Sequence, residues 1–349
     1  MSIYEARLQA DLEAISRRVD AVASLVVDNV EEAVAALVAW DHLRCYRVGL
    51  KDKAINRETR AIDVLCHEFV ARHFPAAGHL RFISSALRLD VELERVGDYA
   101  VNIARRSVLL HTRPSEANLK VVQQVGATAT ALLRDAVTAW SLRDAEAARP
   151  LISRSRAFTK AHERKIDALI DPGEGDVEDL FIVRDVLYNL IRVGAQARNL
   201  CEETLFTVTG ETKEPKTYNV LFVGDGNSRL TQLAEAFARK AFPQSGQYAS
   251  AGWAPADVLD PEMYELAATA GLDLGGAVPR PLSDELPALE RYHVIVSMQP
   301  GALEHLGDLP YSTVFLEWHL PDTDLRGQFK EVSSQVRDLM LALSGPEAR

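Results

Sequence analysis

Three carboxylates and one amide recur at four-residue steps in a predicted helix that runs from about residue 82 to residue 107. They are Asp90, Glu94, Asp98 and Asn102. Four-residue steps place side chains on one face of a helix, so their oxygen atoms form a stripe. Like charges at this spacing cost a helix roughly 0.2–0.5 kcal/mol per pair, and a bound cation would remove that cost. Carboxylate and amide oxygens suit Mg²⁺, Mn²⁺ or iron, so the stripe is a candidate metal site.

A single helix supplies only part of a coordination shell, so a second helix has to contribute ligands. Asp52 and Asn56 lie one helical turn apart and are the predicted partners of the stripe. The spacing leaves an alternative open, in which the stripe is a solvated acidic face without a metal. In that alternative, three basic residues of the same helix neutralise the carboxylates: Arg88, Arg95 and Arg105.

A second candidate site follows a strand-like run at residues 218–223. Its turn contains Gly224, Gly226, Asn227 and Ser228, and a helical pattern begins near residue 230. A junction of strand, tight loop and helix can bind an anion through backbone N–H groups and the positive end of the helix. The dinucleotide-binding pattern G-x-G-x-x-G does not fit, because an arginine stands where its third glycine should be.

The elements around these sites fall into two classes. Residues 3–207 carry apolar side chains at three- and four-residue steps, a pattern typical of helices. Pro and Gly interrupt this pattern at residues 75–78 and 171–175, and a polar segment at residues 209–216 precedes the first strand-like run. An α/β unit is predicted beyond that segment, with later strands and a final helix expected at residues 292–298, 313–317 and 332–343.

The helical part contains an internal repeat. Residues 33–41 are echoed by residues 136–144, and Arg95-Val96-Gly97 is echoed by Arg192-Val193-Gly194. Two three-helix units are therefore expected to pack as one all-α body. The predicted parts are a first repeat at 1–113, a second repeat at 114–210, a linker at 211–217 and an α/β domain at 218–349.

Composition narrows the possible partners and the location. The chain has 50 Asp and Glu against 39 Lys and Arg, a formal charge of -11, and no basic run, so no nucleic-acid partner is expected. Its first residues, MSIYEARLQADLEAISRR, lack an apolar signal region, and we expect a cytoplasmic protein without membrane insertion. Its three cysteines, an odd number without short spacing, fit neither a disulfide scaffold nor a zinc site.

The run Glu94-Arg95-Val96-Gly97-Asp98-Tyr99-Ala100-Val101-Asn102-Ile103 resembles the signature of the PhoU family of phosphate-signalling regulators. The resemblance implies two three-helix repeats, each with an E-x-x-x-D pair that can hold iron or another metal. It also implies self-association as a homodimer and a sensor histidine kinase or a phosphate transporter ATPase as partner. The second repeat departs from the pattern, because Ile191 and Ala195 replace the two carboxylates. We therefore expect a divalent or iron ion only at the first repeat.

Residues 218–345 are similar to the low-molecular-weight protein tyrosine phosphatases and the related arsenate reductases, through the run from Val220 to Ala236 and later matches such as Glu317-Trp318-His319-Leu320-Pro321-Asp322. The resemblance implies a small doubly wound, flavodoxin-like sheet. The family's nucleophilic cysteine falls on Gly224, and its phosphate-binding arginine falls on Leu230. Asp322 matches the general acid, and Asp225 adds a negative charge that opposes phosphate.

Together, the two resemblances imply a cytoplasmic regulator of phosphate uptake and signalling whose phosphatase-like domain lacks the nucleophile and the phosphate-binding arginine that catalysis needs. A phosphatase or arsenate reductase is the alternative from a different class, although no cysteine follows Cys201. A metal-binding scaffold without a signalling role is the third possibility.

Overall fold

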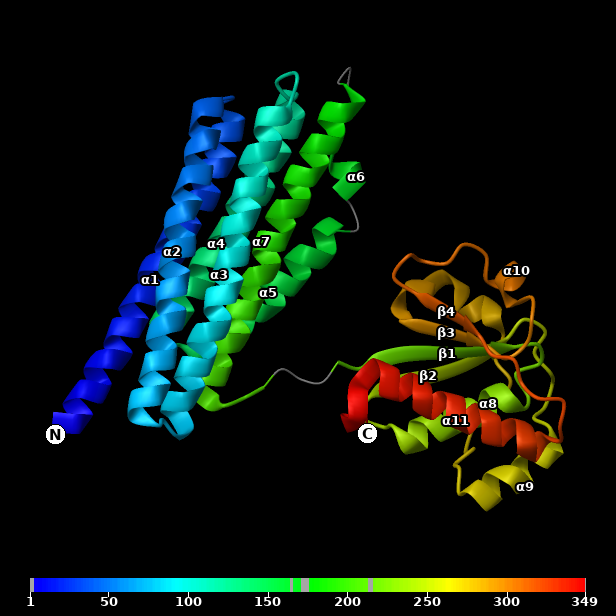
Figure 1. The fold of residues 1–349 in the computed structure, drawn as a ribbon. Helices are drawn as coiled ribbons and strands as arrows, with labels where there is room; N and C mark the ends of the chain where they lie inside the picture. Colours follow the sequence, from blue (N-terminus) through cyan, green and yellow to red (C-terminus); the bar gives the residue numbers. More distant parts are fainter. Residues whose placement is uncertain (1–2, 164–165, 171–175, 213–215, 349) are drawn as a thin grey trace. The chain divides into compact units, whose positions relative to one another are not determined.

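The computed structural model describes residues 3–163, 166–170, 176–212 and 216–348. The chain divides into two compact units, Met1–Lys213 and Glu214–Arg349. The first unit is all-α and the second is α/β, which confirms the predicted fold class (Figure 1). The interruption predicted at residues 171–175 lies outside the described residues.

Long helices make up the first unit. They are α1 (Ile3–Val38), α2 (His42–His73), α3 (Ala77–Leu109), α4 (Glu116–Ser141), α5 (Ala145–Glu163), the short α6 (Ile166–Leu169) and α7 (Val177–Thr209). The helix that carries the acidic stripe, α3, extends beyond both of its predicted ends. One hydrophobic core joins residues of both repeats, so the two three-helix units form a single body.

The turns that separate α1 from α2 and α4 from α5 repeat one another in detail. Trp40 and Arg143 both adopt positive φ angles, 57° and 52°, at the end of the preceding helix. The next residue, Asp41 or Asp144, then accepts a hydrogen bond from a backbone N–H three residues on and caps the following helix. The sequence echo between residues 33–41 and 136–144 thus corresponds to one turn structure used twice.

Helices α3 and α7 lie antiparallel and connect the two repeats. Arg88 pairs with Glu203 at 2.8 Å, and Arg106 pairs with Asp185 at 3.1 Å. Between these ion pairs, the amide of Asn199 donates a hydrogen bond of 3.2 Å to Glu92. One face of α3 is therefore occupied by α7.

Residues 216–348, the described part of the second unit, contain four parallel strands in the order β2-β1-β3-β4. They are β1 (Tyr218–Gly224), β2 (Gly246–Gly252), β3 (Val294–Ser297) and β4 (Val314–Glu317). Helices α8 (Leu230–Ala241) and α11 (Leu325–Ser344) cover one face, and α9 (Pro261–Ala270) packs beside them. The other face packs against the short helix α10 (Ala302–Leu306) and two 3-10 turns, Leu282–Asp284 and Leu286–Arg291.

The chain leaves β1 toward β2 on one side and returns to β3 on the other side. This change of direction defines a topological switch point at the carboxyl end of β1, where ligands bind in open α/β sheets. The predicted anion loop begins at that position, with Gly224 as the last residue of β1. Among the residues that the structure describes, no helix combines the length and the apolar character needed to cross a membrane.

Candidate functional sites

Helices α2 and α3 approach each other closely beside the acidic stripe. Gly97 of α3 has no side chain, and Oδ1 of Asp52 lies 3.2 Å from the position that a Cβ atom would take there. Asp52 is buried, with 7% of its surface exposed. The carboxylate predicted to complete the site therefore enters the interface between the two helices.

Asp52 and Asn56 form a linked pair with free acceptor oxygens. The Asn56 amide donates a hydrogen bond of 3.0 Å to Oδ2 of Asp52. The Oδ1 atoms of both residues are buried and have no hydrogen-bond partner in the described part of the chain. Buried acceptors without partners are uncommon in native proteins, and a cation would satisfy both of them. This donor set fits a hard metal ion.

Two carboxylates at the interface of α2 and α3 have raised pKa values. Burial raises the pKa of Asp52, and the nearby charge of Asp98 raises it further. Burial also raises the pKa of Asp90 to about 7, with contributions from Glu94 and Asp63. Charges of the facing helix thus contribute to both shifts: Asp98 of α3 acts on Asp52, and Asp63 of α2 acts on Asp90.

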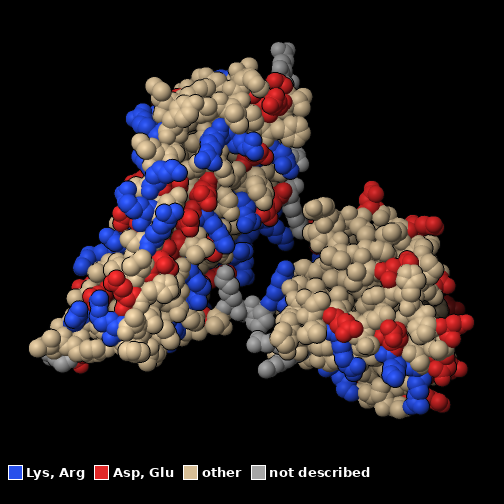
Figure 2. All heavy atoms as spheres, viewed as in Figure 1, with Lys and Arg blue, Asp and Glu red and all other residues tan. Residues whose placement is uncertain are grey.

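Asp63 was not predicted as a site residue. It follows Asp52 by eleven residues, about three helical turns, so their shared face of α2 was visible in the sequence. Asp90 resembles Asp52 in having a buried Oδ1 atom without a hydrogen-bond partner. Asn102, the last predicted ligand, is exposed on α3. Figure 2 shows acidic side chains in a line over the bundle, with Lys and Arg beside them.

The described residues contain one compact group of three metal-binding side chains, and the sequence did not predict it. Its members are His111, Asp176 and Glu178, whose ligand atoms lie within 4.8 Å of one another. All three are exposed, and Asp176 caps α7 by accepting a hydrogen bond from the N–H of Glu178. Carboxylates at this position stabilise the start of a helix without a metal.

Two of the three arginines that were expected to neutralise the stripe have other partners. Arg88 pairs with Glu203 of α7, and Arg95 pairs with Glu92. Arg105 acts on the pKa of Asp52 but forms no ion pair within 4.0 Å in the described structure. Arg88 and Arg95 are therefore engaged by other carboxylates, whereas the charges of Arg105 and Lys53 still lower the pKa of Asp52.

The second repeat has the same close approach of two helices but a different occupant. Gly194 of α7 faces the ring of Phe158 of α5, which would lie 2.4 Å from a Cβ atom at that position. Ile191 and Ala195 are buried. An aromatic ring thus fills the place that corresponds to the Asp52 carboxylate in the first repeat.

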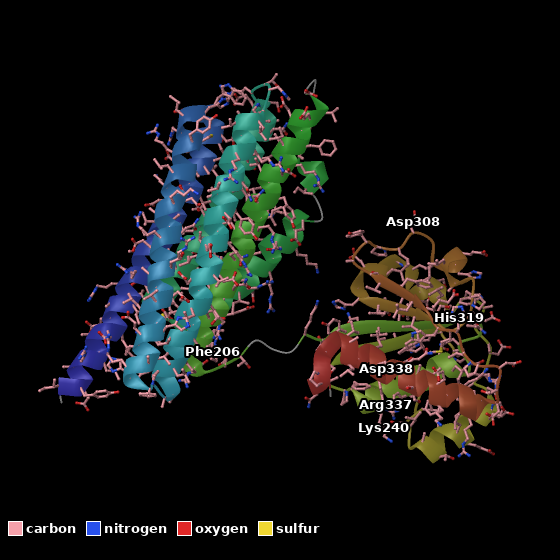
Figure 3. All side chains as sticks on the ribbon, in the orientation of Figure 1. Phe206, Lys240, Asp308, His319, Arg337 and Asp338 are labelled. Carbon is pink, nitrogen blue, oxygen red and sulfur yellow. The ribbon has the colours of Figure 1, made fainter. Side chains whose placement is uncertain are left out.

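The anion loop lines a cavity of about 580 Å³ at the carboxyl ends of the strands. Residues 224–231, 298–300 and 317–320 surround it together with Gln328. His319, labelled in Figure 3, lies at this edge of the sheet. The loop itself is held by the buried side chain of Asn227, whose backbone adopts a φ of 48°. Its Oδ1 accepts hydrogen bonds from Gln232 and from the N–H of Arg280.

Backbone donors of the loop point to an anion or another acceptor as ligand. The N–H groups of residues 226–230 have no hydrogen-bond acceptor among the described residues. The preceding N–H, that of Asp225, donates to Oε1 of Gln299 at 2.5 Å. The loop therefore presents a row of free N–H donors. The N–H of Asp225, just before them, is already satisfied by the side-chain amide of Gln299.

The residues to which the phosphatase resemblance assigned roles have the following surroundings in the structure. Gly224 offers no nucleophile, and Leu230 packs partly against two hydrophobic clusters. Arg229 forms ion pairs with Asp260 at 3.0 Å and Glu262 at 3.6 Å, so its charge is directed elsewhere. Asp322 is exposed and is not among the residues that line the cavity.

The three cysteines are all buried in the helical unit. Burial raises the pKa of Cys66 and of Cys201 to about 12, and it also raises the pKa of Cys45. A thiol with a raised pKa is a poor nucleophile at neutral pH, because the thiolate is the reactive form.

The fold and the two sites define a class of protein: a two-repeat helical bundle with an acidic stripe, followed by a small phosphatase-type α/β unit. Residues 19–107 match the PhoU domain, and residues 219–343 match the low molecular weight phosphotyrosine protein phosphatase family. The chain is 30% identical over 208 residues to a phosphate-specific transport system accessory protein PhoU homolog of Pseudomonas putida, which covers 58% of this chain and 81% of that protein. The chain belongs to the PhoU family and carries a phosphatase-type domain after its PhoU part.

Two solved structures illustrate the similarity of the parts. PhoU from Pseudomonas aeruginosa is 28% identical, covers 58% of this chain and 99% of its own, and gives a TM-score of 0.55. The thioredoxin-dependent arsenate reductase of Corynebacterium glutamicum is 22% identical over 45% of this chain and 75% of its own, with a TM-score of 0.34.

Proposed function

We propose that this chain is a cytoplasmic regulator of phosphate uptake and phosphate signalling that acts through protein contacts. The similarity of its helical unit to accessory proteins of the phosphate-specific transport system carries the proposal. The partner would be a sensor histidine kinase or the ATPase of a phosphate transporter, and the active form would be a homodimer. In this proposal, the chain consists of four parts: repeats at 1–113 and 114–210, a linker at 211–217 and a domain at 218–349.

In this proposal, the metal lies only at the first repeat. Asp52, Asn56 and Asp98 would hold a divalent or iron ion between α2 and α3, with Asp90, Glu94 and Asn102 nearby on α3. Its charge would satisfy the Oδ1 atoms of Asp52 and Asn56, which are buried without hydrogen-bond partners. The ion would stabilise the contact between the two helices, and no catalytic step is assigned to it.

The α/β unit would act as a binding module without turnover. The absence of a nucleophile at Gly224 supports this part of the proposal, since covalent catalysis requires one. The free N–H groups after Gly226 favour an acceptor, and Asp225 disfavours a highly charged anion such as phosphate. We infer that a carboxylate or backbone carbonyl of a partner protein occupies the loop.

A pull-down with the full chain, from cells grown in phosphate excess and in phosphate starvation, tests the proposal. We expect a kinase or a transporter subunit that is enriched in one condition. The double variant Asn227→Ala, Ser228→Ala should weaken this capture, whereas Val278→Ala, an exposed position of the same unit, should leave it unchanged. A protein that captures neither partner in either condition would show that the regulatory proposal is wrong.

A further inference from the structure

Three large apolar side chains project into solvent from the first turns of α2. Leu43 is 74% exposed, Tyr46 is 64% exposed and Leu50 is 72% exposed. Steps of three and four residues place them on one outward face, while Cys45 and Val48 on the opposite face are buried. Single exposed apolar residues are common, but an aligned group of three on one helix face indicates an interaction surface.

Cationic side chains accompany these apolar residues. Arg47, Lys51 and Lys53 are exposed, and within the described ranges none of them has a carboxylate within 4.0 Å. Their neighbour Arg44 is already paired with Glu32 at 3.0 Å. We refer to six residues together as the α2 patch: Leu43, Tyr46, Arg47, Leu50, Lys51 and Lys53.

The charge of the α2 patch is opposite to that of the chain, whose formal net charge is -11. Figure 2 shows Lys and Arg side chains gathered over the part of the bundle where α2 faces the viewer. Among the nearby acids, Glu32 is engaged by Arg44, Asp52 is buried and Asp41 caps α2. Asp28 of α1 remains exposed. The unpaired cations therefore favour an anionic partner.

The arrangement of the α2 patch distinguishes between kinds of anionic partner. The patch is the outward face of one helix. A Cβ atom added at Gly49, in the middle of the patch, would have no other atom within 4 Å, so no neighbouring element covers this point. A protein partner would need a groove shaped to this face, whereas a bilayer adapts to it. Leucine side chains enter the boundary of the acyl chains, tyrosine lies at the level of the headgroups, and Lys and Arg meet lipid phosphates.

We propose that the α2 patch binds the surface of an anionic lipid bilayer, with the first turns of α2 in the plane of the headgroups. This contact lies on the membrane and does not span it. It goes beyond the proposed regulatory role, and it does not depend on the metal or on the loop of the α/β unit.

Co-sedimentation of the full chain with vesicles tests the proposal. We expect binding to vesicles of phosphatidylcholine with 30% phosphatidylglycerol, none to pure phosphatidylcholine, and release by 0.5 M NaCl. Replacement of three cations, Arg47→Gln, Lys51→Gln and Lys53→Gln, should lower the partition coefficient roughly 100-fold, since each contributes about 1 kcal/mol near such a surface. The apolar variant Leu43→Ser, Leu50→Ser should lower it by about tenfold or more.

A variant on the other unit, Lys330→Gln with Leu341→Ser, removes one cation and one exposed leucine and should bind like the wild type. All replaced residues are exposed, and an unchanged thermal midpoint will show that the variants are folded. Absence of binding to anionic vesicles would overturn the proposal, as would equal binding by the α2 variants. If the protein binds polyglutamate and not vesicles, and the α2 variants lose this binding, then the α2 patch binds an acidic protein. This result would also overturn the membrane proposal.

Discussion

Asp52 of α2 and Gly97 of α3 are in close contact: a Cβ atom added at Gly97 would lie 3.2 Å from Oδ1 of Asp52. A methyl group at residue 97 would therefore push against the carboxylate. We predict that Gly97→Ala lowers the affinity for Mn²⁺ or Fe²⁺ about 10- to 100-fold, as loss of supporting contacts around metal ligands does. Titration calorimetry with the full chain measures this change.

Gly49→Ala provides the matched control, because a Cβ at residue 49 of α2 meets no atom within 4 Å. This variant should keep its metal affinity and gain about 0.5–1 kcal/mol of stability. Equal affinities for wild type and Gly97→Ala would argue against a metal between α2 and α3.

The second prediction concerns which repeat carries the metal. The double variant Glu94→Gln, Asp98→Asn and the single variant Asp52→Asn should each lose bound metal, because the charged oxygens belong to the first repeat. Glu92→Gln is the control, since Glu92 lies on the same helix but faces Asn199 of α7. Elemental analysis after dialysis against Mn²⁺ or Fe²⁺ decides the matter. If the wild-type protein retains no ion, the stripe is a solvated acidic face without a metal, and this prediction is wrong.

The third prediction concerns a buried carboxylate of α7 that holds the loop between α3 and α4. Asp179 accepts hydrogen bonds from the N–H of His111 at 2.8 Å, the N–H of Thr112 at 2.9 Å and the Thr112 hydroxyl at 2.7 Å. Burial raises the pKa of Asp179, but these hydrogen bonds lower it more, and the result is a pKa below the usual value. Asp179→Asn should cost roughly 1.5–3 kcal/mol at pH 7.

A lowered pKa in the folded state fixes the sign of the pH dependence. The stabilisation from Asp179 is fully present above the pKa of the unfolded carboxyl, and it is lost as pH falls through the lower pKa of the folded state. Urea unfolding at pH 7 and at about pH 3 should therefore show the difference between wild type and Asp179→Asn shrinking in acid. A difference that stays constant with pH would contradict the role assigned to this charge.

The sequence predicted the fold class and the twofold repeat, because both depend on local patterns. Apolar spacing marks the helices, and the recurrent turn residues of 33–41 and 136–144 mark the repeat. Ends of elements were less predictable. Helix α11 begins at Leu325, seven residues before its expected start, because Asp324 caps it by accepting a hydrogen bond from the N–H of Gly327.

Contacts between distant segments could not be read from spacing. Nothing near Arg88 in the sequence indicates Glu203 as its partner, and nothing near Gly194 indicates the ring of Phe158. The stripe was predicted on one helix, whereas α2 adds Asp52 near Asp98 and Asp63 near Asp90. Such distinctions depend on helix packing, which the periodicity of one helix does not determine.

The fourth prediction concerns the thiols. Cys45, Cys66 and Cys201 should not react with iodoacetamide at pH 8 in the folded protein, because they are buried and burial raises the pKa of each thiol. After denaturation in urea, all three should be alkylated. Mass spectrometry counts the modified residues. Rapid modification of one thiol in the folded chain would reopen the alternative of a thiol-dependent enzyme.

The last prediction is that the α/β unit neither hydrolyses p-nitrophenyl phosphate nor reduces arsenate, and that a single replacement does not change this. In Gly224→Cys, the new Cβ would lie 3.0 Å from Cγ2 of Thr231 and 3.5 Å from Oε1 of Gln299, so the thiol would enter a crowded position. The variant would also lack a charge to stabilise the transition state, and loss of one such group costs about 10²- to 10³-fold in rate. Activity should require Leu230→Arg as well, although Leu230 packs partly against two hydrophobic clusters and its replacement should lower stability. Turnover of either substrate by the wild type above the uncatalysed rate would show that the unit is an enzyme after all.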